Sequence, residues 1–216
     1  MNANSKLQAA IENVYDAFKD ISKPQFVDGC PCCIDKKGVS ILLTKPLREL
    51  SPDDLTHYAA SVFLTVGSVE DFFYFLPRIL EILALNSDWW PDPEVVTRAL
   101  HSSGFHTWPL NKSQAVANYF DVKIADILEQ DQTGWEIDSW ICALGRLQVD
   151  LNPFLKRIAA NPSRLIEYYE VNSSQLNDGK LSNAFWDDAP KEHQQVVEWF
   201  QSVEVKKAIE LAYGFA

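Results

Sequence analysis

The chain has 216 residues, 47% of them hydrophobic and 23% charged, which excludes a wholly disordered protein and allows a sizeable core. Its net charge of −11 repels phosphate backbones and anionic lipid, so we expect no binding to nucleic acid or membranes and an attraction to basic proteins. The sequence shows no signal peptide, no apolar run of about 18 residues and no secreted disulfide framework. We therefore expect a cytoplasmic protein.

The first 50 residues predict a helix, a cysteine-containing loop and an extended segment. Pro24 and Asp28-Gly29 end the helix, and Val39–Thr44 is short, apolar and β-branched, so we expect it to pack as an extended segment. The helix spans Lys6–Asp20, and its apolar face consists of Leu7, Ala10, Ile11, Val14 and Phe18.

A well-formed helix start follows at Ser51-Pro52-Asp53-Asp54, with Ser as N-cap, Pro at the first helical position and acids in the first turn. Apolar residues at spacings of three and four predict that this helix continues to Val66, where Gly67 ends it. The next helix starts at once, so we expect the two to form an antiparallel helical hairpin.

The stretch Ser68–Leu85 predicts the central helix of the fold. Its apolar residues cover most of the helix circumference, whereas an ordinary surface helix buries a stripe of only about 100°. Ser68 and Asp71 form a capping pattern at its start, and Pro77 removes one backbone donor within it. Other helices should therefore cover this one on several sides.

The rest of the chain repeats helices separated by Gly, Pro and Asn-Pro breaks, which predicts an all-α protein. The helix pairs begin about 40 to 50 residues apart, a spacing that resembles HEAT or armadillo arrays. We expect one domain over 1–216, built as a HEAT-like α-solenoid of stacked antiparallel helix pairs or as an irregular helical bundle. The expected helices are Pro93–Ser103, Ser113–Gln130, Glu136–Leu147, Pro153–Ala160, Ser163–Val171, Pro190–Gln201 and Val203–Tyr213.

Cys30, Cys32 and Cys33 crowd together in one loop and are candidate zinc ligands. A closed zinc site needs a fourth ligand, and the usual second ligand pair is missing from this sequence. A redox-active thiol pair and a loop of reduced, partly buried cysteines remain as other interpretations. Cys142 is surrounded by apolar residues and is expected to be a small core residue.

The sequence matches no common catalytic motif and no helix-turn-helix motif of DNA-binding proteins. It contains no metalloprotease, serine-hydrolase, P-loop or dinucleotide-binding pattern, so we expect no enzyme and no cofactor. In Ser113–Gln130, a helix-turn-helix would place Asp121 in its tight turn and further acids against phosphates, so a continuous amphipathic helix is expected.

Four charged residues of the central helix, Glu70, Asp71, Arg78 and Glu81, fall on one stripe and are candidates to line a partner groove. The alternative is that they form the solvated strip of an otherwise buried helix.

Several segments together resemble a group of uncharacterised bacterial proteins. They are DGCPCC, PLRELSPDDLTHYAASVF, TVGSVEDFFYFLPRILEILA and the C-terminal FWDD…VVEWFQS, within about Cys30–Ala84 and Phe185–Tyr213. The resemblance implies that the cysteine loop and the central helix belong to one unit, and it implies no activity.

The sequence therefore favours a protein–protein interaction module with a basic partner. An inhibitor- or immunity-type protein fits this class by analogy. The alternative is a zinc or redox-thiol protein centred on the cysteine loop.

Overall fold

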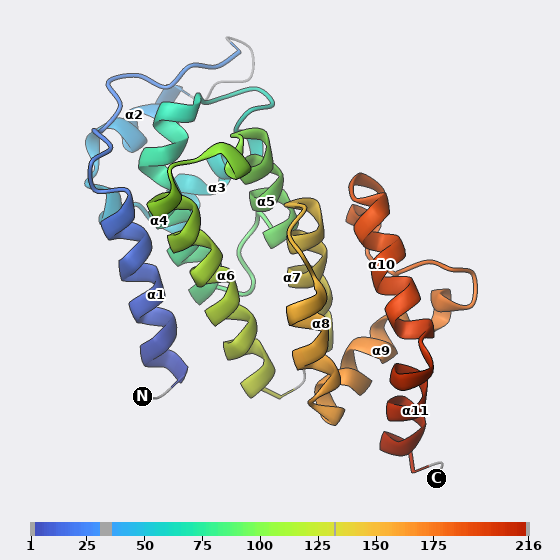
Figure 1. The fold of residues 1–216 in the computed structure, drawn as a ribbon. Coiled ribbons are helices and arrows are strands. Elements are labelled where there is room, and N and C mark those ends of the chain that lie inside the picture. Colours follow the sequence, from blue (N-terminus) through green and yellow to red (C-terminus); the bar gives the residue numbers. More distant parts are fainter. Residues whose placement is uncertain (1–2, 31–35, 132, 215–216) are drawn as a thin grey trace. The chain divides into compact units, whose positions relative to one another are not determined.

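The computed structural model describes residues 3–30, 36–131 and 133–214. Within these residues the chain forms eleven α-helices and three short 3-10 helices and no strand, which confirms the all-α prediction (Figure 1). Contacts divide the chain into two compact units, Met1–Val122 and Lys123–Ala216, and helix α6 (Leu110–Glu129) contributes to both. The HEAT-like repeat and the single domain stay predictions.

Unit 1 is assembled around α4 (Val69–Leu85), the central helix of the sequence analysis. Ten of its 17 residues are buried, and it packs against α1 (Ala3–Ala17), α3 (Pro52–Ser61) and the 3-10 helix η1 (Leu47–Glu49). The hydroxyl of Tyr119 in α6 also donates a hydrogen bond to the carbonyl oxygen of Leu80, at 2.8 Å. The expected central position of this helix within its unit is therefore confirmed.

Helix α1 presents the apolar face that its periodicity predicts. The five predicted residues are all at most 4% exposed, and they are Leu7, Ala10, Ile11 and Val14 of α1 and Phe18 just after its end. At the start of α4, the Ser68 side chain accepts from the Asp71 amide and the Asp71 carboxylate accepts from the Ser68 amide, so the expected cap is present. The helix continues through Pro77.

Two predictions in unit 1 are wrong. Val39–Thr44 is not extended but belongs to α2 (Lys36–Thr44), where the Thr44 hydroxyl and the Lys45 amide bond to carbonyls one turn earlier. A lone strand would leave its backbone amides and carbonyls unpaired, whereas a helix pairs them locally. Helix α3 ends at Ser61 instead of Val66, because Phe63, with φ of 63°, turns the chain.

The remaining elements of unit 1 close the fold around α3 and α4. Helix α5 (Pro93–Ser102) packs against α3, and Gly104, with φ of 77°, ends it as expected. The 3-10 helix η2 (Phe105–Thr107) then leads into α6. Because α6 is one continuous helix of 20 residues, the structure confirms the sequence-based argument against a helix-turn-helix in this segment.

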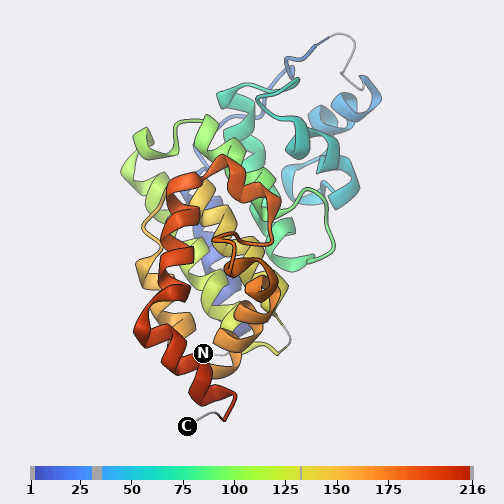
Figure 2. The ribbon, with the colours of Figure 1, turned by 90° about the vertical axis from the view of Figure 1, so that its right-hand side faces the viewer.

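Unit 2 has α7 (Gly134–Arg146) at its centre, with 11 of its 13 residues buried. Helices α9 (Pro162–Leu176) and α10 (Pro190–Gln201) and the 3-10 helix η3 (Ala184–Asp188) pack on α7, and α8 (Asn152–Ala159) packs on α9. Helix α11 (Val203–Ala212) follows α10 directly and packs against both α9 and α10 (Figure 2).

Helix α9 runs five residues beyond the predicted end at Val171, into a stretch that its polar composition assigned to a loop. Asn172 explains the difference: it is fully buried, its amide donates to the Asp138 carboxylate at 2.8 Å, and its oxygen accepts from the Ser182 amide. A polar residue in this stretch is thus part of the core of unit 2. Cys142 is also fully buried, as expected.

Candidate functional site

The four residues of the predicted stripe lie in different surroundings. Glu70 is exposed in the first turn of α4, whereas Asp71 is only 2% exposed and accepts hydrogen bonds from the Ser68 amide and the Tyr58 hydroxyl. Burial raises the pKa of Asp71 above its usual value. Asp71 therefore caps the helix inside the core. Arg78 and Glu81, farther along α4, form an ion pair with each other.

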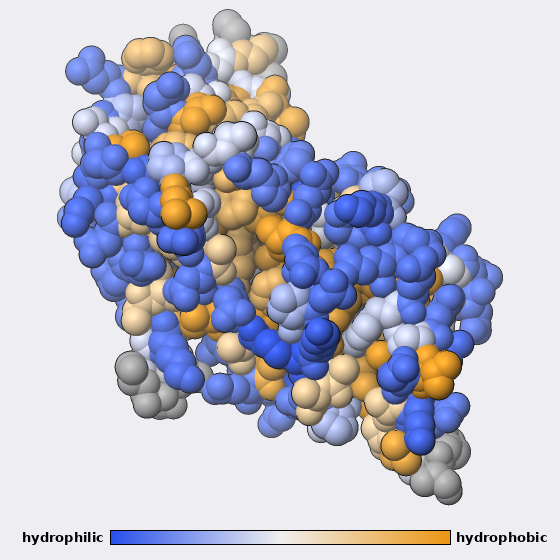
Figure 3. Space-filling model, in the orientation of Figure 1, coloured by the Kyte–Doolittle hydropathy of each residue, from blue (hydrophilic) through white to orange (hydrophobic). Residues whose placement is uncertain are grey.

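A groove of about 710 Å³ lies in unit 1 between α1, η1 and α4. Its apolar lining includes Tyr15, Ile21, Leu47 and Tyr74, which are half-buried, and Phe18 and Pro77, which are buried. Its charged residues are two acids and two bases, Glu12, Asp16, Lys19 and Arg48. Charged and polar residues also cover much of the molecular face drawn in Figure 3, with apolar residues in smaller patches. The groove thus combines aromatic walls with charges of both signs.

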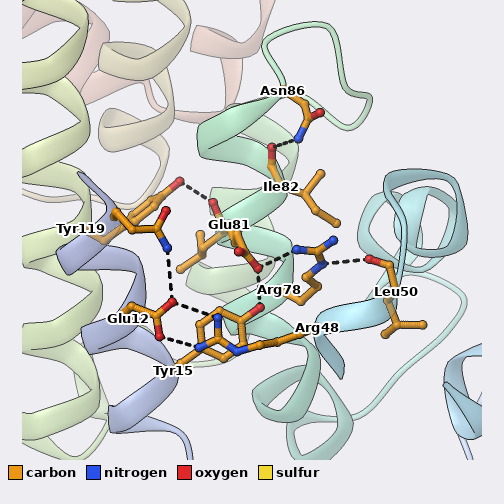
Figure 4. Close-up of polar contacts among 11 residues, drawn as sticks. Glu12, Tyr15, Arg48, Leu50, Arg78, Glu81, Ile82, Asn86 and Tyr119 are labelled. Atoms are coloured by element: carbon orange, nitrogen blue, oxygen red, sulfur yellow. Dashed lines mark hydrogen bonds and ion pairs between the residues drawn. The ribbon is translucent and has the colours of Figure 1, made fainter. Parts of the chain in front are cut away.

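A chain of polar contacts joins Tyr15 of α1 to Glu81 and Arg78 of α4 (Figure 4). The Tyr15 hydroxyl donates to Glu81 Oε2 at 2.6 Å, and the Arg78 guanidinium donates to the same oxygen at 2.6 Å. Arg78 Nε donates in turn to the carbonyl oxygen of Leu50 at 2.8 Å. Burial and the bond to Glu81 raise the pKa of Tyr15 well above its usual value. These contacts hold the Tyr15 ring in one orientation.

Arg48 lines the groove and lies over the ring of Tyr15. Its guanidinium makes two hydrogen bonds to the Glu12 carboxylate, at 2.9 and 2.6 Å, and its Cζ atom lies 3.6 Å from the centre of the Tyr15 ring. The bond from Arg48 lowers the pKa of Glu12. A planar cation is thus held by a carboxylate and an aromatic ring, which is the usual way in which proteins recognise guanidinium groups.

Sequence periodicity identified Arg78 and Glu81 because both belong to one helix. Tyr15, Glu12 and Arg48 were not identified, since their contacts join residues 36 or 66 positions apart. One local signal existed: Glu12 and Tyr15 are three residues apart on α1 and therefore share one side of that helix.

The cysteine cluster lies mostly outside the described residues, because only Cys30 is described and Cys32 and Cys33 are not. Cys30 is half-buried, and its amide donates to the Thr65 carbonyl oxygen at 2.8 Å. The Gly67 amide donates to the Asp28 carbonyl oxygen at 2.8 Å. The loop is therefore tied to the turn between α3 and α4 at its first cysteine. In the described residues, no three His, Cys, Asp or Glu side chains gather as ligands of one metal ion.

No helix in the described part of the chain has the length and apolar character needed to cross a membrane. Comparison with protein-family models, with curated proteins and with solved structures finds no match to this chain.

Proposed function

We propose that the protein is a protein-interaction module and that the groove between α1, η1 and α4 receives a segment of a basic partner. The observation that supports this most directly is the groove itself, an open space of about 710 Å³ lined by the half-buried side chains of Tyr15 and Tyr74. Aromatic side chains in concave sites supply much of the energy of protein recognition, because they bury a large area at low entropic cost.

The charge of the chain supports a basic partner. Unit 1 contains 15 acidic and 10 basic residues, so it attracts cationic surfaces at long range. Within the groove, the Asp16 carboxylate is paired with Lys19 at 3.4 Å, and both side chains are about three-quarters exposed. An exposed pair of this kind is weak, and the Asp16 carboxylate is thus open to a cation from a partner.

A capture experiment with a matched pair of variants tests the proposal. Asn13 is exposed and lines the groove, so Asn13→Arg places a bulky cation where the partner should bind. Asn118 is exposed on α6 and does not line the groove, so Asn118→Arg makes the same chemical change elsewhere in unit 1. The immobilised proteins are incubated with bacterial lysate at low and at high salt, and the retained proteins are identified by mass spectrometry.

We expect the wild-type protein and Asn118→Arg to retain a basic protein at low salt, and Asn13→Arg to lose it. High salt should weaken retention because it screens exposed charges. Retention of no protein at low salt, or equal retention by both variants, would contradict the proposal.

A zinc or redox-thiol role is the second candidate. It is supported by the position of Cys30, whose backbone is fixed at the base of the cysteine loop by the pairing with residues 65–67. Elemental analysis and thiol titration of protein purified without a His-tag provide the test. Stoichiometric zinc that disappears in Cys32→Ser would support this role, and four freely titrating thiols without metal would contradict it.

A further inference from the structure

We infer that the Glu12 carboxylate and the Tyr15 ring form a guanidinium subsite, which Arg48 fills in the free protein and which an arginine of the partner takes over on binding. This inference rests on the proposed function, since it names the chemical group that the groove recognises. The contacts of Arg48 therefore show which contacts an arginine of the partner would make.

The subsite is selective for arginine because it uses both the shape and the charge of the cation. Two parallel hydrogen bonds to Glu12 require two N–H groups in one plane, and stacking on Tyr15 requires a flat group parallel to the ring. The distances of 2.9 and 2.6 Å from the two Arg48 nitrogens to the carboxylate satisfy the first requirement, and the distance of 3.6 Å from Arg48 Cζ to the ring centre places the guanidinium directly over the ring. A lysine ammonium can satisfy neither in full.

The subsite should keep its form when Arg48 leaves. The Tyr15 hydroxyl is bonded to Glu81, and Glu81 is bonded to Arg78, so neither contact involves Arg48. Glu12 projects from a continuous turn of α1, and the Gln8 side chain donates a hydrogen bond to it at 3.2 Å. A preorganised site of this kind binds a new cation without the cost of ordering its own groups.

Of the two arginines near Tyr15, Arg48 is the exchangeable one. It belongs to η1, a three-residue element that contributes no buried residue to the core, and its side chain is 49% exposed. Glu12 is itself 48% exposed, so a competing guanidinium group can reach its carboxylate from solvent. The Arg78 side chain is only 19% exposed and is bonded to both Glu81 and Leu50.

A partner arginine has a reason to prefer this subsite over water. The groove is also lined by Tyr74, Leu47 and Ile21, which are half-buried and offer apolar contacts to the residues on either side of that arginine. The partner segment thus adds apolar burial to the guanidinium contacts, and this addition drives the exchange.

The test opens the subsite and adds back a guanidinium group. In Arg48→Ala the subsite is vacant, and N-acetyl-arginine amide is titrated into the full-length protein while the Tyr15 ring signals are followed by NMR. Parallel titrations use N-acetyl-lysine amide and N-acetyl-citrulline amide, the latter being a neutral analogue of arginine. Lys6→Ala changes the charge by the same amount at an exposed position of α1 outside the groove and serves as the control.

We expect Arg48→Ala to bind the arginine probe about tenfold or more tightly than wild-type or Lys6→Ala, and to discriminate against lysine and citrulline. The double variant Arg48→Ala/Glu12→Gln should lose this increase in affinity for the arginine probe. Equal binding by Arg48→Ala and Lys6→Ala, or equal binding of all three probes, would overturn the inference. If Arg48→Ala does not fold, Arg48→Lys replaces it, because the probe should displace lysine more readily than arginine, and failure to do so would equally overturn it.

The two proposals can fail separately. Loss of partner capture in Asn13→Arg together with no arginine binding by Arg48→Ala would leave the groove function standing and remove the guanidinium subsite. Arginine binding by Arg48→Ala with unchanged capture by Asn13→Arg would leave the subsite standing and remove the groove as the partner site.

Discussion

Replacement of Glu81 by alanine should destabilise unit 1 strongly, although the residue carries a charge on the expected polar stripe of α4. Glu81 Oε2 accepts hydrogen bonds from both Tyr15 and Arg78, and the side chains of the Arg78–Glu81 pair are only 19% and 12% exposed (Figure 4). The change would leave the Arg78 cation without its carboxylate and the Tyr15 hydroxyl without its acceptor.

The structure sets the size of this effect. Breaking a buried ion pair on one side costs about 3–5 kcal/mol, and a hydrogen bond to a charged group contributes about 1.5–3 kcal/mol. Because both side chains keep some contact with water and Arg78 keeps its bond to Leu50, we expect a loss of about 2–3 kcal/mol in the free energy of unfolding. The pKa of Tyr15 should fall at the same time, since Glu81 no longer raises it.

Urea denaturation followed by circular dichroism measures the loss, and an NMR titration that follows the Tyr15 ring signals measures the pKa of this one tyrosine among seven. Glu70→Ala, an exposed acid on the same helix, is the control and should change stability by about 0.5 kcal/mol. Arg78→Met should cost less in the Glu81→Ala background than in the wild-type protein, because its partner is already gone. If Glu81→Ala were as stable as Glu70→Ala, the buried role of the pair would be refuted.

Three further changes test other parts of the fold. Gly145→Ala should destabilise unit 2 by about 1–3 kcal/mol in urea denaturation, because its Cβ would lie 2.5 Å from the Trp186 ring, and a cost below 0.5 kcal/mol would contradict this. Ser68→Ala removes the cap of α4 and should cost about 1 kcal/mol by the same measurement, whereas no cost would mean that the cap is dispensable. His193 accepts a hydrogen bond from the Leu181 amide, and burial lowers the pKa of His193. The neutral imidazole therefore stabilises the fold above the unfolded-state pKa of about 6.5, and this stabilisation is lost as the pH falls through the lower pKa of the folded state. Stability measured between pH 7.5 and 5 should therefore fall more in the wild-type protein than in His193→Gln, and parallel curves would exclude this role.

Local patterns predicted the elements whose packing follows one helical face. The apolar positions of α1 and the Ser68 cap of α4 were read from spacing alone, because the helix period fixes which residues share a face. The pattern failed at Val39–Thr44, where β-branched residues favoured an extended chain, yet the segment had no strand to pair with and became helical. It failed again at Asn172, whose polar side chain is paired in the core with Asp138.

The sequence predicted two residues of the candidate site but not their contacts with the rest of it. Arg78 and Glu81 could be placed on one stripe because they are three residues apart, whereas the contacts of Tyr15 with Glu81 and of Arg48 with Glu12 depend on the tertiary fold. The sequence also could not predict which of these side chains are exposed. Glu70 and Asp71 are neighbours in sequence, yet Glu70 is exposed and Asp71 is buried. A stripe on a helix therefore predicts which side chains share a face, and packing decides which of them can meet a partner.

Hydrogen exchange of the protein with its captured partner tests the central claim most directly. If the partner binds in the groove, it should slow amide exchange in residues 9–21 of the α1 region and in residues 46–50 around η1, with little change in unit 2. Protection confined to residues 123–214 would contradict the assignment of the partner site to the groove between α1, η1 and α4.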